Sequence, residues 1–203
     1  MSSELKTFLK EITSIFESLD YVKPESIPNI DLYMDQVTTF MDTQLESTKR
    51  HPDDKILTKT MINNYAKNDL LPPPVKKKYS EEHLLLLIFI YYFKNILSIN
   101  DIQTMLKPIT ERYFGKDNDI NLKSIYEGVF SLEHEDMTME LKEIVRKYKV
   151  SQSTFKDVEN PDDKALLDTF SFVCMLSFDI YVKKMVLEKI IDKFSEENEK
   201  STE

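Results

Sequence analysis

The chain has 203 residues, a formal net charge of −9 and only two glycines, Gly115 and Gly128. Because phosphate-cradling loops and dinucleotide fingerprints need several glycines at fixed spacing, the sequence excludes both kinds of site. The same shortage disfavours an all-β fold, whose tight hairpins rely on glycine at positive φ. We therefore expect an all-α protein.

Cysteine content and apolar runs indicate a cytoplasmic protein without a membrane segment. Cys174 is the only cysteine, so no intrachain disulfide can form. The longest strongly apolar run, from Leu84 to Phe93, is ten residues long, about half of the ~20 residues that span a bilayer. The N-terminal residues carry Glu4 early and do not resemble a secretory signal.

Apolar residues at helical spacing divide the first half of the chain into short helices. Thr58 is a good N-cap for the third of them, in which Ile62 and Tyr65 face inward. Ser98 and Asp101 have the spacing of a capping box for the fifth, which we expect to stop near Pro108. The predicted helices cover about residues 5–19, 31–45, 59–67, 80–97 and 98–106, with a polar loop at 46–55.

The second half is again predicted to be helical, over about residues 121–132, 139–148 and 161–194. Asn160 and Pro161 supply an N-cap and a first-turn proline for the last helix. Apolar residues recur along it in steps of four and three, which is a heptad seam. Two alternatives remain open, a central core helix or a dimer contact. The seam consists of Leu166, Phe170, Val173, Ser177, Ile180, Lys184, Leu187, Ile191 and Phe194.

Positive charge is concentrated in one region of this acidic chain. Residues 49–78 contain eight Lys or Arg residues against three Asp or Glu residues, a local charge of +5. A basic island on an acidic body is the form expected of a small nucleic-acid-binding protein. The alternative is a charged loop that is merely solvated.

The segment from Ile56 to Leu87 resembles the DNA-binding domain of the MerR (mercury-resistance regulator) family of transcription factors. The resemblance is carried by Thr60–Tyr65 in a short helix, by Asp69–Pro73 at its end, and by Tyr79–Glu82 at the next helix start. It implies a helix-turn-helix followed by a basic wing. Ser98 and Ile102 fall where that family begins its fourth helix.

The longer run from Ile30 to about Leu106 resembles an uncharacterised bacterial family, the domain of unknown function numbered eighteen-thirty-six. This resemblance covers roughly half of the chain and implies no established activity.

The sequence departs from the MerR pattern at residues that contact DNA in that family. Asn63 and Asn64 replace an arginine and a tyrosine, Asp69 replaces a glycine, and the wing is reduced to Val75–Lys78 without a glycine to turn it. Asparagine can still read an adenine edge, and lysines can neutralise phosphates. The candidate DNA-binding residues are Lys59, Thr60, Asn63, Asn64, Lys67, Lys76, Lys77 and Lys78.

Catalytic and metal chemistry have weak support. His51, His83 and His134 are far apart in the sequence, with no ligand spacing around them. No nucleophile or acid–base pair stands out, so we expect neither an enzyme nor a cofactor.

These observations predict an all-α cytoplasmic regulator with a MerR-like helix-turn-helix N-terminal half and a C-terminal helical bundle. The predicted domains are residues 1–110, with the helix-turn-helix at about 30–106, and residues 111–203. Double-stranded DNA is the expected partner, with a homodimer formed through the C-terminal helix and an unknown effector. The alternative is a protein-interaction adaptor that kept the fold without binding DNA.

Overall fold

The computed structural model describes residues 7, 8, 10–14, 21–116, 118–131 and 133–200. The chain divides into two compact units. The central unit contains the described residues of 18–131 and 190–203, and the hairpin unit contains those of 1–17 and 132–189. The predicted domain boundary between residues 110 and 111 stays a prediction.

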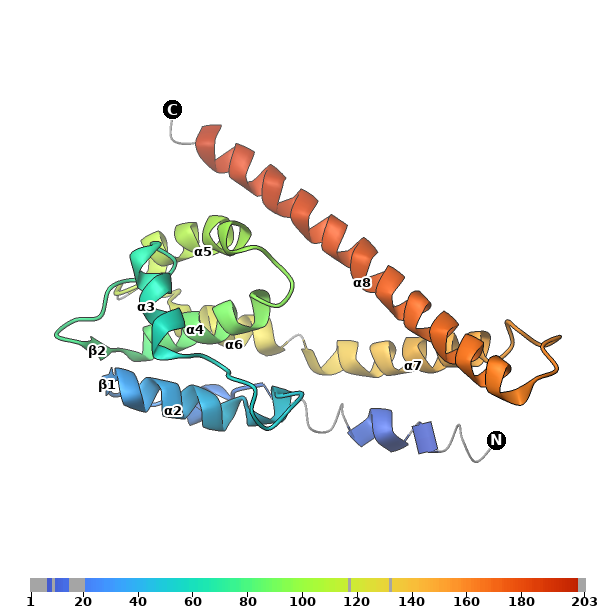
Figure 1. Ribbon diagram of the computed structural model, residues 1–203. Coiled ribbons are helices and arrows are strands. Elements are labelled where there is room, and N and C mark those ends of the chain that lie inside the picture. Colours follow the sequence, from blue (N-terminus) through green and yellow to red (C-terminus); the bar gives the residue numbers. More distant parts are fainter. Residues whose placement is uncertain (1–6, 9, 15–20, 117, 132, 201–203) are drawn as a thin grey trace. The chain divides into compact units, whose positions relative to one another are not determined.

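The central unit is helical apart from two short strands (Figure 1). The strands pair antiparallel, with Leu32 opposite Tyr79 and Tyr33 opposite Lys78. All-α character is therefore confirmed. The elements are η1 (Pro24–Ser26), β1 (Leu32–Tyr33), α2 (Met34–Gln44), η2 (Glu46–Thr48), α3 (Lys59–Lys67), β2 (Lys78–Tyr79), α4 (Glu81–Phe93), α5 (Ile99–Tyr113) and α6 (Leu122–Ser131).

Helix α4 forms the centre of this unit. Every residue from His83 to Tyr91 is buried, as expected for a helix that is apolar on all sides. It packs against α6, where Tyr126 is fully buried and its hydroxyl donates a 2.5 Å hydrogen bond to the carbonyl of Val22. The Phe89 ring lies 5.5 Å from the Tyr126 ring, edge to face. The other helices of the central unit thus pack around one buried helix, α4.

The predicted first residues of the helices agree with the structure better than the predicted last residues do. Thr58 accepts from the Met61 amide at 3.2 Å, and the Ser98 hydroxyl accepts from the Asp101 amide at 3.1 Å, so both N-caps are confirmed. The predicted stop at Pro108 is wrong, because α5 continues through this proline to Tyr113. Residues beyond it, Ile109 and Tyr113, pack against the core. That packing outweighs the backbone hydrogen bond that proline removes.

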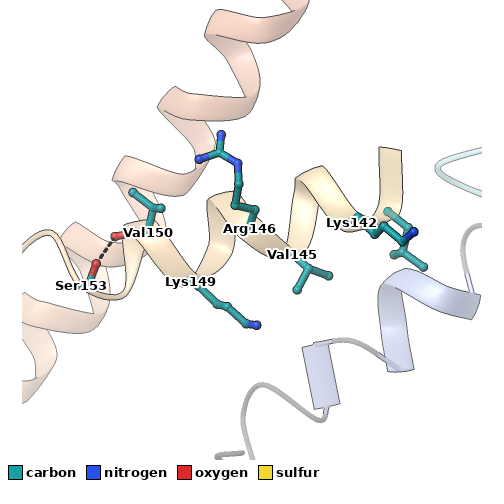
Figure 2. A pocket seen from close by; sticks show the side chains of 7 residues that line it. Lys142, Val145, Arg146, Lys149, Val150 and Ser153 are labelled. Atoms are coloured by element: carbon teal, nitrogen blue, oxygen red, sulfur yellow. Dashed lines mark hydrogen bonds between the residues drawn. The ribbon is translucent and has the colours of Figure 1, made fainter. Parts of the chain in front are cut away.

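The hairpin unit is built on two antiparallel helices, α7 (Glu133–Ser151) and the part of α8 (Pro161–Lys200) up to residue 189. Ion pairs cross between them, from Lys183 to Glu140 at 2.5 Å and from Lys147 to Asp179. Helix α7 is longer than the predicted 139–148. One face of α7 borders a cavity of about 590 Å³ (Figure 2).

Aromatic stacking attaches the N-terminal segment to this hairpin. The Phe8 ring stacks on Tyr148 of α7 with centroids 4.1 Å apart, and it meets Phe172 of α8 edge to face at 5.6 Å. Residues 7, 8 and 10–14 are helical. The rest of the predicted 5–19 helix lies outside the described residues.

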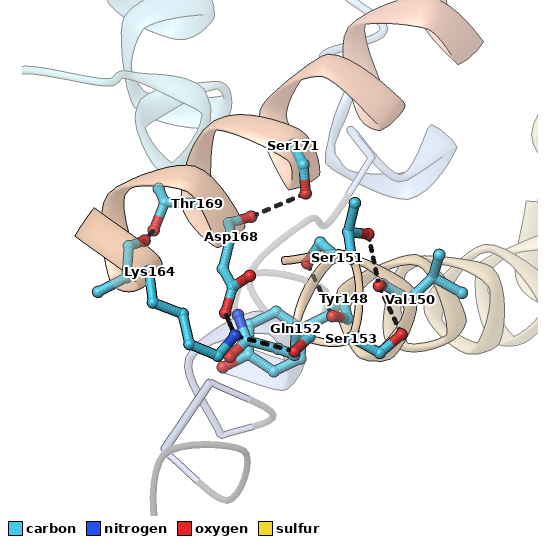
Figure 3. A network of polar contacts seen from close by, with 11 residues as sticks. Tyr148, Val150, Ser151, Gln152, Ser153, Lys164, Asp168, Thr169 and Ser171 are labelled. Carbon is cyan, nitrogen blue, oxygen red and sulfur yellow. Dashed lines mark hydrogen bonds and ion pairs between the residues drawn. The ribbon is translucent and has the colours of Figure 1, made fainter. Parts of the chain in front are cut away.

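A polar network closes the turn between α7 and α8 (Figure 3). Lys164 Nζ bonds the buried Asp168 carboxylate at 2.6 Å and the Gln152 carbonyl at 3.3 Å. The cation thereby satisfies a carbonyl just beyond the end of α7, a favourable place for positive charge. Asn160 Oδ1 accepts from the Asp162 and Asp163 amides, which confirms the predicted cap of α8.

Much of the predicted heptad seam is exposed to solvent. Leu166, Phe170 and Ile180 are 63–68% exposed, and Val173 is 53% exposed. The α7-facing residues of α8, such as Asp179, lie on another side of the helix. Within the hairpin unit, residues 166–187 are therefore not a buried core helix. Ile191, at the end of the seam, is buried.

Helix α8 is also long and apolar enough to cross a bilayer by length and composition alone. It is the one such helix among the described residues. Asp168 and Asp179 interrupt its apolar middle, and both carboxylates form ion pairs in this structure.

Candidate nucleic-acid interface

Helix α3 presents a polar face outward. Ile62 is fully buried and Tyr65 is 7% exposed, as predicted, so these two side chains orient the helix on the core. The amphipathic spacing leaves five candidate residues on the outer side. Lys59, Thr60, Asn63, Asn64 and Lys67 are all exposed.

The end of α3 is a tight reversal formed without glycine. Asn68 is the C-cap, and Asp69 follows with a positive φ of 53°. The Leu70 amide donates to the Tyr65 carbonyl at 2.9 Å, the long hydrogen bond of a Schellman motif. Aspartate tolerates the left-handed region better than most residues, so Asp69 substitutes for the usual glycine. Leu70 and Leu71 then enter the core.

A second reversal forms the wing, which we define as Val75–Lys78. The Val75 and Lys78 backbones exchange hydrogen bonds of 3.1 and 3.0 Å. Lys76 and Lys77 have φ values of 50° and 65°, the pattern of a type I′ turn. The sequence has no glycine to turn the wing, and the turn closes instead with two lysines in the left-handed region. Both lysines are exposed at its tip.

Lys78 differs from the two tip lysines. It lies in β2 opposite Tyr33, and its Nζ is 5.3 Å from the centre of the Tyr33 ring. This cation–π geometry holds a half-buried lysine beside a 54%-exposed aromatic ring. Sequence reasoning missed Tyr33, because its role depends on the pairing of β1 with β2 and no local pattern signals that pairing.

The free positive charge is smaller than the sequence suggested. Lys59 forms an ion pair with Asp35 of α2, and both side chains are exposed. Lys67, Lys76 and Lys77 form no ion pair with a described residue. A phosphate would thus compete with Asp35 at Lys59 but with no described carboxylate at the other three.

His83 packs against Tyr79, the residue that follows the wing. Its Nδ1 accepts from the Ser80 amide at 3.0 Å, and its ring meets Tyr79 and Phe114 edge to face. Burial lowers the pKa of His83, opposed by the nearby carbonyls of Pro73 and Pro72 and by Asp31. Those carbonyls do not reach hydrogen-bonding geometry with Nε2, which is buried without a partner. The neutral ring is therefore the stable form.

The connection between α2 and α3 is an ordered loop, residues 45–58. Thr48 Oγ1 makes a short hydrogen bond with the Tyr91 hydroxyl, and Lys94 Nζ donates to the Ile56 carbonyl at 2.7 Å. Burial lowers the pKa of Lys94. A helix-turn-helix normally has three or four residues here. The loop is thus held to α4 by side chains where a short turn is usual.

The family assignment agrees with the central unit. The family model described as domain of unknown function (DUF1836) matches residues 22–129, more than half of the chain. The chain belongs to this family. The DUF1836 match begins at Val22 and ends within α6, so it contains α3, the wing and the loop. No curated protein and no solved structure matches the chain significantly.

Metal-binding geometry is absent from the part of the chain that the structure describes. No three or more His, Cys, Asp or Glu side chains gather there as a metal site would require. Residues of this DUF1836 domain that could contact a ligand are instead the exposed amides and cations of α3 and the wing.

Proposed function

We propose that this protein is a DNA-binding transcriptional regulator of the MerR-like type. The observation that carries the proposal is the type I′ turn that follows α3 in the chain and holds Lys76 and Lys77 exposed. Backbone strain of this kind persists where surrounding structure enforces it, often at functional sites. The order β1, α2, α3, wing with β2, α4 and α5 supports this proposal, because a winged helix-turn-helix also places a turn after its second helix.

In this proposal the lysines provide affinity for DNA and the two asparagines recognise its sequence. Lys67, Lys76 and Lys77 would contact phosphates, which gives affinity that depends strongly on salt. Asn63 and Asn64, on the exposed face of α3, would read base edges in the major groove. Lys59 would exchange Asp35 for a phosphate, and Thr60 and Lys78 would border the contact.

The test measures the affinity for mixed-sequence duplex DNA as salt is raised. Changing Lys76, Lys77 and Lys78 together to Glu should abolish binding or reduce the slope of log affinity against log salt by about one per lost contact. The matched control changes Lys149, Lys156 and Lys189 to Glu, which alters net charge equally outside the central unit. Folded wild-type protein that fails to bind at low salt would refute the proposal.

A second candidate function, a protein-interaction adaptor, is favoured by one specific feature. The loop at 45–58 replaces a short turn, and Lys59 is already neutralised by Asp35. If the triple-lysine variant and the wild type both fail to bind DNA, this adaptor function becomes the better one.

We also propose that the regulator is a cytoplasmic homodimer joined through α8. Exposed apolar seam residues from Leu166 to Leu187 cover three heptads, about 32 Å of helix. Monomeric proteins rarely leave apolar surface of that extent uncovered. A membrane would have to accommodate Asp168 and Asp179, which is costly in hydrocarbon. Light scattering tests the dimer, and a monomer at all concentrations would exclude it.

A further inference from the structure

The outer face of the small sheet carries three side chains in one row, Tyr33, Lys78 and Val75, which we call the outer row. Tyr33 pairs with Lys78 across β1 and β2, and Val75 forms an antiparallel bridge with Lys78 on its other side (Figure 1). Residues that pair directly in antiparallel strands point to the same face. The next pair in register, Leu32 and Tyr79, is buried and therefore belongs to the opposite face. The outer row thus points away from the core.

Two members of the outer row expose apolar surface. Tyr33 is 54% exposed and Val75 is 71% exposed. The Nζ of Lys78 lies 5.3 Å from the centre of the Tyr33 ring, so the row alternates aromatic ring, cation and aliphatic group. The solvated face of an antiparallel sheet normally carries polar side chains. A row of this composition fits a partner that offers both apolar surface and negative charge.

The backbone holds the Tyr33 ring in place. Its amide donates to Gln36 Oε1 at 2.9 Å, and the pairing with Lys78 fixes the residue from the other side. The ring also has the Lys78 cation beside it. A side chain that is already positioned loses little conformational entropy when a partner binds. Tyr33 is therefore suited to a contact surface.

The outer row continues into the other candidate DNA-binding residues. At one end, Lys76 and Lys77 form the turn that joins Val75 to Lys78. At the other end, Tyr33 precedes the first turn of α2, where Asp35 forms the ion pair with the first residue of α3. The row thus lies between the two lysines of the wing tip and the start of α3.

We propose that the outer row makes a non-ionic contact with the sugar–phosphate backbone of duplex DNA. The Tyr33 ring and the Val75 side chain would pack on deoxyribose carbons, while Lys76 and Lys77 would meet the neighbouring phosphates. A nucleic-acid strand alternates apolar sugar carbons with anionic phosphates, which matches the composition of this surface. Contacts to sugar and phosphate position a protein on the duplex without reading its sequence. The inference rests on the DNA-binding function proposed above and adds two residues that charge alone does not identify.

The experiment measures the affinity for mixed-sequence duplex DNA by fluorescence anisotropy at several salt concentrations. Tyr33→Ala and Val75→Ser should each weaken binding about fivefold at every salt concentration, the effect of losing ~40 Å² of apolar contact. The slope of log affinity against log salt should keep its wild-type value, because neither variant removes a charge. Tyr33→Phe retains the ring and should bind like the wild type.

The matched control is Val129→Ser, which alters a 50%-exposed valine of α6 outside the outer row. It should bind like the wild type, and urea titrations should show that every variant is folded. Val75→Ser tests the contact even if Tyr33→Ala does not fold, because the Val75 side chain is mostly exposed.

The outcomes separate this inference from the function on which it rests. Wild-type affinity in Tyr33→Ala and Val75→Ser, with binding lost in the triple-lysine variant, would overturn the outer-row contact and leave DNA binding in place. A salt slope reduced by about one in Tyr33→Ala would show that the ring only positions Lys78, which also overturns the contact. Folded wild-type protein that does not bind DNA would refute both proposals.

Discussion

His83 is a buried ionisable group at the base of the wing. Its Nδ1 is used by the Ser80 amide, and its Nε2 has no partner. Protonation would place an additional donor where the Ser80 amide already donates. The same ring packs against Tyr79 of β2 and thus connects α4 with the strand that leads out of the wing. Neutral His83 is therefore part of the wing's support.

Stability should fall in acid because of this residue. Burial lowers the folded-state pKa of His83 below its usual ~6.5, so its contribution is complete above that pH and is lost as pH falls below it. The free energy of unfolding should decline by up to about 1.4 kcal/mol per pH unit in this window. Urea titrations between pH 7 and pH 5 measure the effect.

The variant His83→Gln should flatten this dependence. Glutamine is a usual third residue of a capping box, so it keeps a side chain able to accept from Ser80. The control His51→Gln alters an exposed histidine and should leave the wild-type slope unchanged. An unchanged slope in His83→Gln would mean that another group causes the acid sensitivity.

At the scale of elements, the wing is closed by residues that do not favour its geometry. Lys76 and Lys77 both occupy the left-handed region, which costs about 1–2 kcal/mol per residue relative to glycine's freedom there. The β1–β2 pairing and the buried Tyr79 hold the adjacent chain in place. Local strain at the tip is thus offset by the contacts at the base.

Replacing Lys77 with Gly should relieve this strain. We expect a rise in the free energy of unfolding of about 0.5–1 kcal/mol, because the steric cost removed exceeds glycine's entropy in the unfolded chain. DNA affinity should fall at the same time through the lost charge. Chemical denaturation provides the first measurement and anisotropy the second.

The control Lys55→Gly removes an exposed lysine whose φ is not positive. It should leave stability unchanged or lower it. A destabilised Lys77→Gly variant would contradict the strained turn.

Helices of this protein are predictable where local chemistry decides them. The bounds of α3 follow from Thr58 at one end and Leu70–Leu71 at the other, and sequence reasoning located both. The predicted helix end at Pro108 was wrong because a helix continues through a proline only where other contacts stabilise it. Here those contacts come from Ile109 and Tyr113, whose packing a single sequence does not reveal. The two strands and the Tyr33–Lys78 contact were likewise not predicted, because they depend on pairing between residues far apart in the sequence.

The candidate DNA-binding residues were predicted from their charge and expected exposure. The structure adds which of them already have an ion-pair or ring partner within the protein. All but the half-buried Lys78 are exposed as expected. The ion pair of Lys59 with Asp35 joins residues 24 positions apart, which no local pattern predicts. The charge of Lys76 and Lys77 is visible in the sequence, whereas their left-handed backbone conformation depends on the pairing at the base of the wing.

At the scale of the whole molecule, the exposed seam of α8 is an extended apolar surface. Introducing Glu at Val173 and Ile180 should place charges within the proposed dimer contact and yield a monomer, halving the mass measured by light scattering. The same change at Val182 and Met185, also exposed but outside the seam, should leave the dimer intact. Dissociation by the second pair instead would move the contact to another face of α8.

The single cysteine allows the distance between two copies of α8 to be measured. Cys174 is exposed, so one spin label or fluorophore can be attached per chain without removing other thiols. In a parallel pair of α8 helices the two labels would stand side by side, about 10 Å apart across the helix axes. In an antiparallel pair centred on Ile180 they would be displaced by ~18 Å along the axis. A single distance distribution therefore distinguishes the two orientations of the chains.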